Sequence, residues 1–257
     1  MNKKIRNIIK KKGKIKIVCL TAYSKNIGKI IDKYCDLILV GDSMANVLYG
    51  MKNTHKINLQ TIENHSKAVR LGVKKSLLVV DMPKGSYKNP REAKINAKSL
   101  IKKTGCDAVK IENNSANLNI VSSLYNSGIN VMGHIGFTPQ FKKNFKIEGV
   151  TSNQQSKLIN QAKKIELAGA FSIVLECISK KTSKKITESI RIPTIGIGSS
   201  EECDGQILVT DDILGLSGFY PKFVKKYINS EKLIKKAVKR YSNDVKSKKF
   251  PSKKNSF

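Results

Sequence analysis

The stretch Asp-Leu-Ile-Leu-Val-Gly-Asp-Ser at residues 36–43 carries the pattern that decides the fold, a short apolar run that ends in glycine and a carboxylate. Short runs rich in Val, Ile and Leu are typical of strands that are buried on both faces of a parallel sheet. Runs of this kind recur along the chain at Lys14–Leu20, Asp36–Val40, Ser76–Val80, Ala108–Ile111, Ile129–Met132, Ser172–Leu175 and Pro193–Ile197, with a weaker eighth at Ile213–Leu216.

Segments with helical spacing separate these runs. They are Ile27–Tyr34, Leu59–Leu71, Pro90–Lys103, Leu118–Ser127, Asn153–Ala168, Lys180–Ser189 and Glu231–Tyr241. Strands that alternate with helices indicate βαβ units and a parallel sheet. Seven or eight such units in 257 residues favour a single (β/α)₈ TIM barrel, with its active site at the C-terminal strand ends, over an open sheet. The sequence predicts one domain over residues 1–257, with a basic lead-in at 1–13 and a polar basic tail at 246–257.

The net charge of +30 does not by itself indicate a nucleic-acid-binding protein. Only five of the 49 basic residues are arginine, which leaves 44 lysines spread along the chain. Sequence-specific recognition favours the planar fork of arginine, and no aromatic stacking motif accompanies the lysines. We therefore expect no specific nucleic-acid partner, although weak attraction to polyanions is expected of so basic a surface.

The remaining composition favours a cytoplasmic enzyme. No apolar run reaches the length of a membrane span, and no secretory signal follows the N-terminus, so we expect no membrane partner. The five cysteines, at 19, 35, 106, 177 and 203, form no Cys-x-x-Cys pair and lie mostly within apolar runs. This spacing is typical of reduced, buried thiols.

Ionisable or polar residues follow six successive runs at their C-terminal ends. They are Asp42 and Ser43, Asp81, Lys110 and Glu112, His134, Glu176, and Ser199. Each has a structural alternative: an aspartate after a strand often caps a helix, a single histidine is often a core residue, and Lys110 with Glu112 could be an ion pair. Because the C-terminal ends of barrel strands meet at one face, however, the whole set is expected to share one site.

Such a set suits chemistry on an α-keto acid. Carboxylates from neighbouring strands favour a hard cation such as Mg²⁺, which takes one or two carboxylates together with substrate oxygens. A chelated α-keto acid has a more acidic C–H beside its ketone, and a glutamate of raised pKa could remove that proton. The sequence has no histidine or cysteine cluster for zinc, no dinucleotide-binding glycine motif and no Gly-x-Ser-x-Gly nucleophile motif.

An ordered series of short motifs resembles the ketopantoate hydroxymethyltransferase family. The motifs are Thr21-Ala22-Tyr23, Val40-Gly41-Asp42-Ser43, Asp81-Met82-Pro83, Val109-Lys110-Ile111-Glu112, Gly133-His134-Ile135-Gly136-Phe137-Thr138-Pro139-Gln140, Val174-Leu175-Glu176-Cys177, Ile195-Gly196-Ile197-Gly198 and Asp204-Gly205-Gln206-Ile207-Leu208-Val209. The resemblance continues through Pro221–Lys225 and Phe250-Pro251 to Ser256-Phe257, so it covers essentially the whole chain.

The resemblance implies a hydroxymethyltransferase. Its reaction would be transfer from 5,10-methylenetetrahydrofolate to the Mg²⁺-bound enolate of 3-methyl-2-oxobutanoate, giving 2-dehydropantoate in pantothenate and coenzyme A biosynthesis. Glu176 would be the catalytic base. Asp42 and Asp81 would bind Mg²⁺ and lie at the substrate, with Glu112 near the metal through water, while Ser43, Lys110 and His134 would hold the α-keto acid. The family also implies a homo-oligomer, a decamer.

The chain departs from the family pattern outside these residues. Met44-Ala45 replace the usual Leu-Gly, Ser24 and Lys84 replace an aspartate and a phenylalanine, and the Phe141–Val150 loop is shorter and lacks the paired glycines and the arginine. These changes concern the folate side. Two rival functions remain open: another Mg²⁺-dependent α-keto-acid barrel enzyme of the phosphoenolpyruvate mutase or isocitrate lyase type, which needs a reactive cysteine or a phosphate-binding loop, and a basic polyanion-binding protein.

Overall fold

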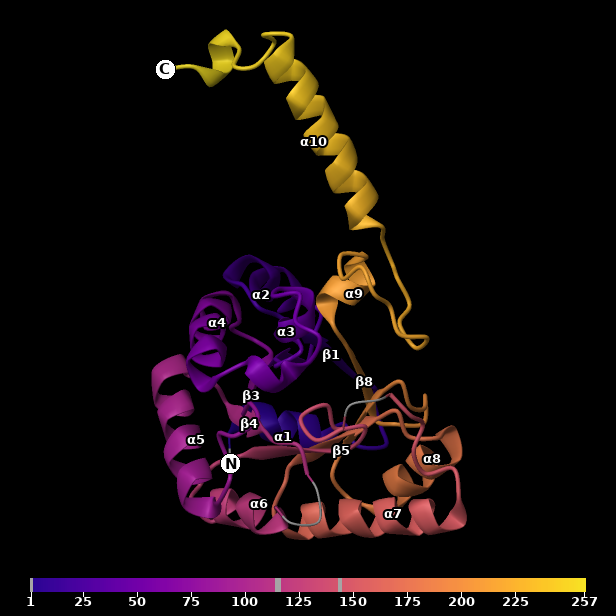
Figure 1. The fold of residues 1–257 in the computed structure, drawn as a ribbon. Helices are drawn as coiled ribbons and strands as arrows, with labels where there is room; N and C mark the ends of the chain where they lie inside the picture. The colour runs from indigo at the N-terminus through magenta and orange to yellow at the C-terminus, as the bar shows by residue number, and fades with distance from the viewer. Residues whose placement is uncertain (1, 114–116, 143–144) are drawn as a thin grey trace. The chain divides into compact units, whose positions relative to one another are not determined.

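Eight parallel strands close into a barrel in the computed structural model, which describes residues 2–113, 117–142 and 145–257 (Figure 1). The strands are β1 (Ile17–Thr21), β2 (Leu37–Val40), β3 (Leu77–Asp81), β4 (Ala108–Lys110), β5 (Val131–Gly136), β6 (Ser172–Glu176), β7 (Thr194–Ile197) and β8 (Gly205–Leu208). Each strand pairs in parallel with the next one in the chain, and β8 pairs with β1 to close the ring. The predicted TIM barrel is confirmed.

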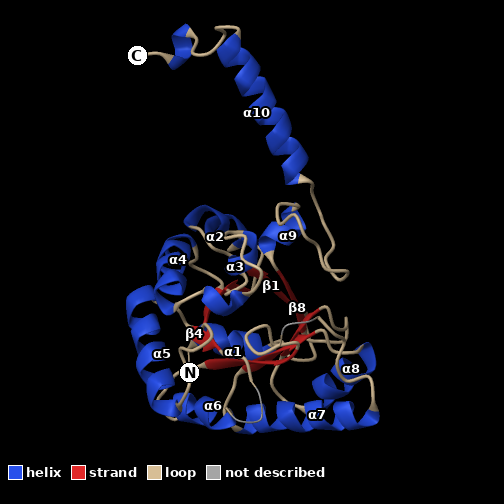
Figure 2. Cartoon of the chain, viewed as in Figure 1, coloured by secondary structure: helices blue, strands red, loops and turns tan. Residues whose placement is uncertain are grey.

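Helices surround the strands, as Figure 2 shows in blue and red. They are α1 (Lys3–Lys10), α2 (Lys25–Ile31), α3 (Met44–Val47), α4 (Leu59–Gly72), α5 (Pro90–Thr104), α6 (Leu118–Tyr125), α7 (Ser152–Leu167) and α8 (Lys180–Ser189), with a short 3₁₀ turn at Thr54–Lys56. Side chains that accept hydrogen bonds from the first turn fix several starts, such as Asn89 before Pro90 in α5 and the capping box of Thr151 and Gln154 in α7.

The chain divides into two compact units, Met1–Val209, which holds the barrel, and Thr210–Phe257. The second unit contains α9 (Thr210–Leu214), α10 (Ser230–Lys246) and a 3₁₀ turn at Lys253–Asn255. Helix α10 has no buried residue, although its sequence is amphipathic. Within the described residues, no helix is long and apolar enough to cross a membrane.

The eighth strand differs from the prediction. The weak apolar run at Ile213–Leu216 lies at the end of α9 and beyond it, whereas β8 is Gly205–Leu208. A strand that begins with glycine and has only two successive apolar residues does not stand out by its hydrophobicity. Glycine is needed there because a Cβ at Gly205 would lie 2.5 Å from the backbone oxygen of Ile17.

The basic lead-in forms α1, which lies at the N-terminal end of the barrel. Ile5 and Ile8 are buried against the inward-facing apolar residues of the strands, including Ile17 and Leu37. Burying each isoleucine contributes about 1.5–3 kcal/mol. Its lysines therefore flank an apolar stripe that closes one end of the barrel.

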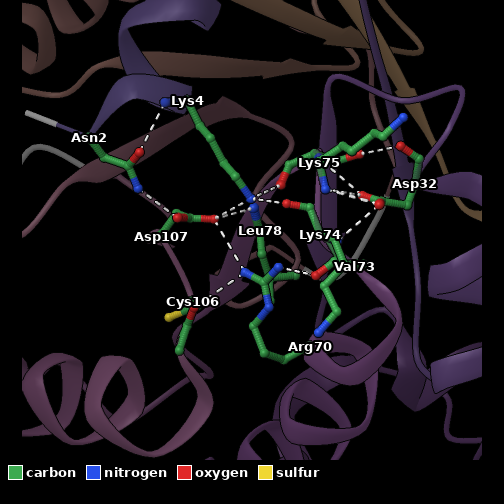
Figure 3. A network of polar contacts seen from close by, with 12 residues as sticks. Asn2, Lys4, Asp32, Arg70, Val73, Lys74, Lys75, Leu78, Cys106 and Asp107 are labelled. Carbon is green, nitrogen blue, oxygen red and sulfur yellow. Dashed lines mark hydrogen bonds and ion pairs between the residues drawn. The ribbon is translucent and has the colours of Figure 1, made fainter.

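Polar contacts attach α1 to the strand starts (Figure 3). The Asn2 side-chain amide donates to Asp107 Oδ1 at 2.6 Å, and Lys4 Nζ donates to the backbone oxygen of Ser76 at 2.8 Å. Asp107 Oδ2 also accepts from the backbone N–H of Leu78 at 3.0 Å. Ser76, Leu78 and Asp107 lie before or at the start of strands, whereas Asn2 and Lys4 belong to the start of α1. They stabilise the end of the barrel opposite the C-terminal strand ends, and we assign them a structural role.

Candidate functional site

The alternation of side chains along the strands brings most of the predicted residues into the barrel interior. In β3, Leu77 and Val79 belong to the interior apolar cluster, so Asp81, two residues further on, points the same way. The same two-residue period places Lys110 and Glu112 after Ala108. His134 follows Met132 in β5, and Glu176 follows Val174 in β6. This register turns five sequence-predicted side chains toward one C-terminal mouth.

Asp81 and Lys110 form a buried ion pair. The two residues are register partners in the β3–β4 ladder, and Lys110 Nζ lies 2.6 Å from Asp81 Oδ1. The other oxygen, Asp81 Oδ2, accepts from the backbone N–H of Asp42 at 3.1 Å. Gly41, which precedes Asp42, lies beside this contact, and a Cβ there would be 2.9 Å from Ser43 Oγ and 3.4 Å from Asp81 Oδ2. Asp81 thus contacts the ends of both neighbouring strands.

Glu176 ends β6 at a tightly packed point of the barrel. Gly136, its register partner in β5, has φ +94°, and a Cβ there would lie 2.1 Å from the backbone oxygen of Glu176. Cys177, which follows Glu176, has φ +52° and so lies in the left-handed region that non-glycine residues rarely adopt. The close approach of Gly136 and the left-handed backbone of Cys177 therefore constrain the backbone at Glu176.

His134 lies between two glutamates. Its Nε2 is 3.1 Å from Glu176 Oε2, and its Nδ1 is 3.8 Å from Glu112 Oε1. Neither contact has hydrogen-bond geometry, so both ring nitrogens and Glu112 Oε1 are buried polar atoms without a hydrogen-bond partner among the described residues. Buried polar groups are almost always hydrogen-bonded in folded proteins. Three unsatisfied atoms on two neighbouring side chains are therefore evidence that the mouth binds a polar ligand.

The carboxyl groups of the mouth outnumber its cations. Burial, together with the charge of Asp81, raises the pKa of Asp42 to about 7, and burial raises the pKa of Glu176 to about 8. Burial and the charge of Asp42 also raise the pKa of Glu112 well above its usual value. Burial disfavours the Lys110 ammonium, but Asp81, Glu112 and Asp42 outweigh this and raise its pKa.

The excess of carboxyl groups over cationic groups suits the binding of a divalent cation. Four carboxyl groups face one lysine, because burial and Lys110 lower the pKa of His134 and keep the imidazole neutral. No group of three or more His, Cys, Asp or Glu in metal-binding geometry occurs among residues 2–113, 117–142 and 145–257. Mg²⁺ requires fewer protein ligands, because it keeps waters and takes substrate oxygens. Asp42 and Asp81 are the pair that could hold it.

Ser43 is the remaining predicted residue, and it lies at the start of α3 without capping that helix through its side chain. Its Oγ lies 2.9 Å from the hydroxyl of Tyr23, which follows β1. The side chain is half-buried and next to Asp42 in the chain. The structure thus brings all seven predicted residues to the ends of β2 to β6.

Gln140 is a buried residue of the site to which the sequence analysis gave no role. It is 1% exposed, and its backbone N–H donates to Glu112 Oε2 at 2.9 Å. Its side-chain Nε2 donates to Asp42 Oδ2 at 2.8 Å. Only its place at the end of the Gly133–Gln140 motif could have drawn attention to it, because a glutamine after Thr-Pro is otherwise typical of an exposed turn.

None of the five cysteines is a reactive thiolate. All are free and buried, and burial raises the pKa of each. Cys177, the one nearest to the site, has a pKa of about 12 because of burial and the charge of Glu176. The alternative function, an enzyme of the phosphoenolpyruvate mutase or isocitrate lyase type, requires a reactive cysteine or a phosphate-binding loop. These thiols do not supply the reactive cysteine.

A cavity of about 620 Å³ lies beside the mouth, against α7 and the loop after β5. Phe141, Lys142, Lys157 and Lys164 contribute to its lining. The seven predicted residues do not line it. The Phe141–Val150 loop borders it, although residues 143 and 144 of this loop lie outside the described residues.

The chain is similar over its length to hydroxymethyltransferases. A family model described as ketopantoate hydroxymethyltransferase matches residues 2–253. A 3-methyl-2-oxobutanoate hydroxymethyltransferase of Pelagibacter ubique is 51% identical over 257 residues, which cover 100% of both chains. The protein of the same name from Anaplasma marginale is 46% identical over 250 residues, 96% of this chain and 90% of the other.

Solved structures with a similar fold have much lower sequence identity. A phosphoenolpyruvate phosphomutase from Streptomyces platensis has a TM-score of 0.64 at 10% identity, over 95% of this chain and 87% of the other. A phosphonopyruvate hydrolase solved with oxalate and Mg²⁺ has a TM-score of 0.61 at 11% identity, over 98% and 93%. At these identities the likeness concerns the fold alone.

Proposed function

The chain belongs to the ketopantoate hydroxymethyltransferase family, and from this premise we propose how its barrel mouth carries out the reaction. The enzyme transfers a hydroxymethyl group to 3-methyl-2-oxobutanoate, a step of pantothenate and coenzyme A biosynthesis. The one-carbon donor of the proposal is 5,10-methylenetetrahydrofolate. The observation that carries the proposal is the position of Glu176, a desolvated carboxylate beside a cluster that suits a chelated α-keto acid.

Asp42 and Asp81 are the proposed metal ligands, with Glu112 close to the ion through water. The excess of carboxyl groups and the unsatisfied Glu112 Oε1 support this assignment. When bound, Mg²⁺ would supply Lewis acidity that polarises the ketone and makes the neighbouring C–H more acidic. Lys110 holds Asp81 in place and remains charged.

Ser43, Lys110 and His134 are the proposed contacts of the substrate carboxylate and ketone. Among residues 2–113, 117–142 and 145–257, neither nitrogen of the neutral His134 ring has a hydrogen-bond partner, and one of them carries a proton that it can donate. Ser43 Oγ and the Lys110 ammonium add a hydroxyl and a positive charge. A donor set of this kind suits an anionic α-keto acid, since hydrogen bonds to a carboxylate from charged donors are the strong ones.

Glu176 is the proposed general base. It removes the single proton from C3 of 3-methyl-2-oxobutanoate and leaves the enolate. A pKa raised to about 8 makes this carboxylate a much stronger base than an exposed glutamate, near the optimum for proton transfer at neutral pH. The enolate carbon then forms a bond to the one-carbon unit, so that keto acid, methylenetetrahydrofolate and water give 2-dehydropantoate and tetrahydrofolate.

The cavity beside α7 supports the presence of a second, anionic substrate. Lys142, Lys157 and Lys164 line it together with Glu148, which forms an ion pair with Lys142, and Phe141 offers an aromatic face. Gly136, which pairs with Glu176, also lines it, so the cavity adjoins the proposed base. We place the folate there. The homo-oligomer implied by the family is likewise a proposal, and the exposed apolar side chains of α10 support it.

The test is proton NMR of 3-methyl-2-oxobutanoate in D₂O with the purified protein. We expect deuterium at C3 only when Mg²⁺ is present, and 2-dehydropantoate once methylenetetrahydrofolate is added. Glu176→Gln should bind the keto acid and lose exchange, whereas Glu201→Gln, which changes an exposed carboxylate, should exchange as the parent does. Exchange at the parent rate in Glu176→Gln would exclude Glu176 as the base.

A further inference from the structure

We propose that Gln140 is a positioning residue of the metal site, locked by Tyr87, which determines the oxygens that Asp42 and Glu112 present to the cation. The inference rests on the proposed metal site. Gln140 lies in the loop after β5, yet its hydrogen bonds reach the ends of three other strands. It is uncharged, so it can order the carboxylates without neutralising them.

Every polar group of the Gln140 side chain has a partner. Nε2 donates to Asp42 Oδ2 at 2.8 Å and to the backbone oxygen of Met82 at 3.1 Å. Oε1 accepts from the Tyr87 hydroxyl at 2.5 Å. Asp42 follows β2 and Met82 follows β3, so one amide in the loop after β5 connects two neighbouring strand ends. A side chain that is 1% exposed with all its hydrogen bonds made has one stable position.

The partners also fix which way the amide faces. The Met82 carbonyl can only accept, so the amide nitrogen must be on that side. Tyr87 is buried, and its hydroxyl donates to Oε1 at 2.5 Å. A flipped amide would lose the bond to Met82 and would place Oε1 against Asp42 Oδ2. Nε2 is therefore held toward Asp42.

Gln140 therefore hydrogen-bonds to only one of the two oxygens of each carboxylate. Gln140 takes Asp42 Oδ2 through its side chain and Glu112 Oε2 through its backbone N–H. The opposite oxygen of Glu112, Oε1, is buried and has no hydrogen-bond partner in the part of the chain that the structure describes. An oxygen held in place and left unsatisfied is suited to a cation or its water, because groups behind the ligands orient them.

The experiment measures Mg²⁺ binding directly by isothermal titration calorimetry. Gln140→Met keeps the length and apolar volume of the side chain and removes its hydrogen bonds. We expect Mg²⁺ to bind about 10-fold or more weakly, the typical effect of losing such a supporting group. Tyr87→Phe removes one hydroxyl and should weaken binding by a smaller factor. If Gln140→Met does not fold, the comparison of Tyr87→Phe with the parent decides.

Gln155→Met is the matched control, because Gln155 also donates through Nε2, to Thr182, and accepts through Oε1, from Lys185, but joins α7 to α8. It should bind Mg²⁺ as the parent does. In kinetics, Gln140→Met should need more Mg²⁺ and regain a near-parental KM for the keto acid at saturating Mg²⁺, which a general loss of structure would not produce.

The outcomes separate the two proposals. A folded Gln140→Met variant, or Tyr87→Phe, that binds Mg²⁺ with the parental affinity overturns the role of Gln140 while the metal site stands. A parent protein that does not bind Mg²⁺ at all overturns the metal site and the inference together.

Discussion

Replacing Glu176 by glutamine should change the pH dependence of folding stability in the metal-free protein. A carboxyl in the unfolded chain has a pKa of about 4.3, whereas burial raises that of Glu176 to about 8 in the fold. Between these values the folded protein binds one more proton than the unfolded chain. Stability therefore falls as pH rises through this window, and the loss is complete only above the folded pKa.

The magnitude follows from linkage. One proton of difference costs at most about 1.4 kcal/mol per pH unit, so pH 5 to 7 removes about 2–3 kcal/mol. For a chain of this size that corresponds to about 5–10 °C in Tm. The amide of Glu176→Gln does not titrate. The variant and the parent should therefore be closest in stability at pH 5, and the variant should gain relative to the parent at pH 7.

The assay is thermal unfolding with a chelator present, at pH 5, 6, 7 and 8, for the parent, Glu176→Gln and the exposed-carboxylate control Glu201→Gln. Comparing differences between variants removes the effect of the +30 net charge, which the variants share to within one unit. Glu201→Gln should follow the parent. Parallel curves for the parent and Glu176→Gln would refute the argument that burial has raised this pKa.

Four further outcomes are expected. Asp81→Asn should weaken Mg²⁺ binding about 100-fold in calorimetry, with activity partly restored by excess Mg²⁺; unchanged affinity would remove Asp81 from the ligands. Lys157→Glu should raise the KM for methylenetetrahydrofolate several-fold and leave deuterium exchange of the keto acid unchanged, and an unaltered KM would place the folate elsewhere. Cys177→Gly relieves a left-handed backbone and loses a buried sulfur, so urea unfolding should place it within about 1 kcal/mol of the parent; a much larger loss would argue against strain at this residue. Val238→Glu, on the apolar stripe of α10, should lower the sedimentation coefficient of an oligomer. Lys236→Glu, on the opposite side of the helix, should not lower it. Equal effects of the two changes would exclude this stripe from the interface.

The sequence predicted the barrel because strands that are buried on both faces appear in the sequence as continuous apolar runs. Seven apolar runs correspond to β1 to β7, within a few residues at each end. Lys180–Ser189 agrees with α8 at both ends. The predicted position of the eighth strand was wrong. Strand β8 is recognised by its pairing with β1 and β7 and by the close packing of Gly205, which are tertiary properties.

Helix α1 was not predicted for a related reason. Its eight residues, Lys-Lys-Ile-Arg-Asn-Ile-Ile-Lys, are mostly charged or polar, and an isolated helix of this length is unstable in water. What stabilises it is the end of the barrel, where Ile5 and Ile8 are buried. A local pattern cannot reveal a surface that eight distant strands create together.

The charged residues of the site could be predicted one by one, but the arrangement among them could not. Each follows a run of apolar residues, where an ionisable side chain is conspicuous, and the two-residue period of a strand then gives its direction. Gln140 has no such signal, because a neutral amide in a loop resembles any turn residue. Its significance lies in Asp42, Met82, Tyr87 and Glu112, which come from separate parts of the chain. Sequence patterns therefore indicate which charged residues such a site contains. The neutral groups that orient those charged side chains are recognised only in the folded structure, where the strand ends lie together.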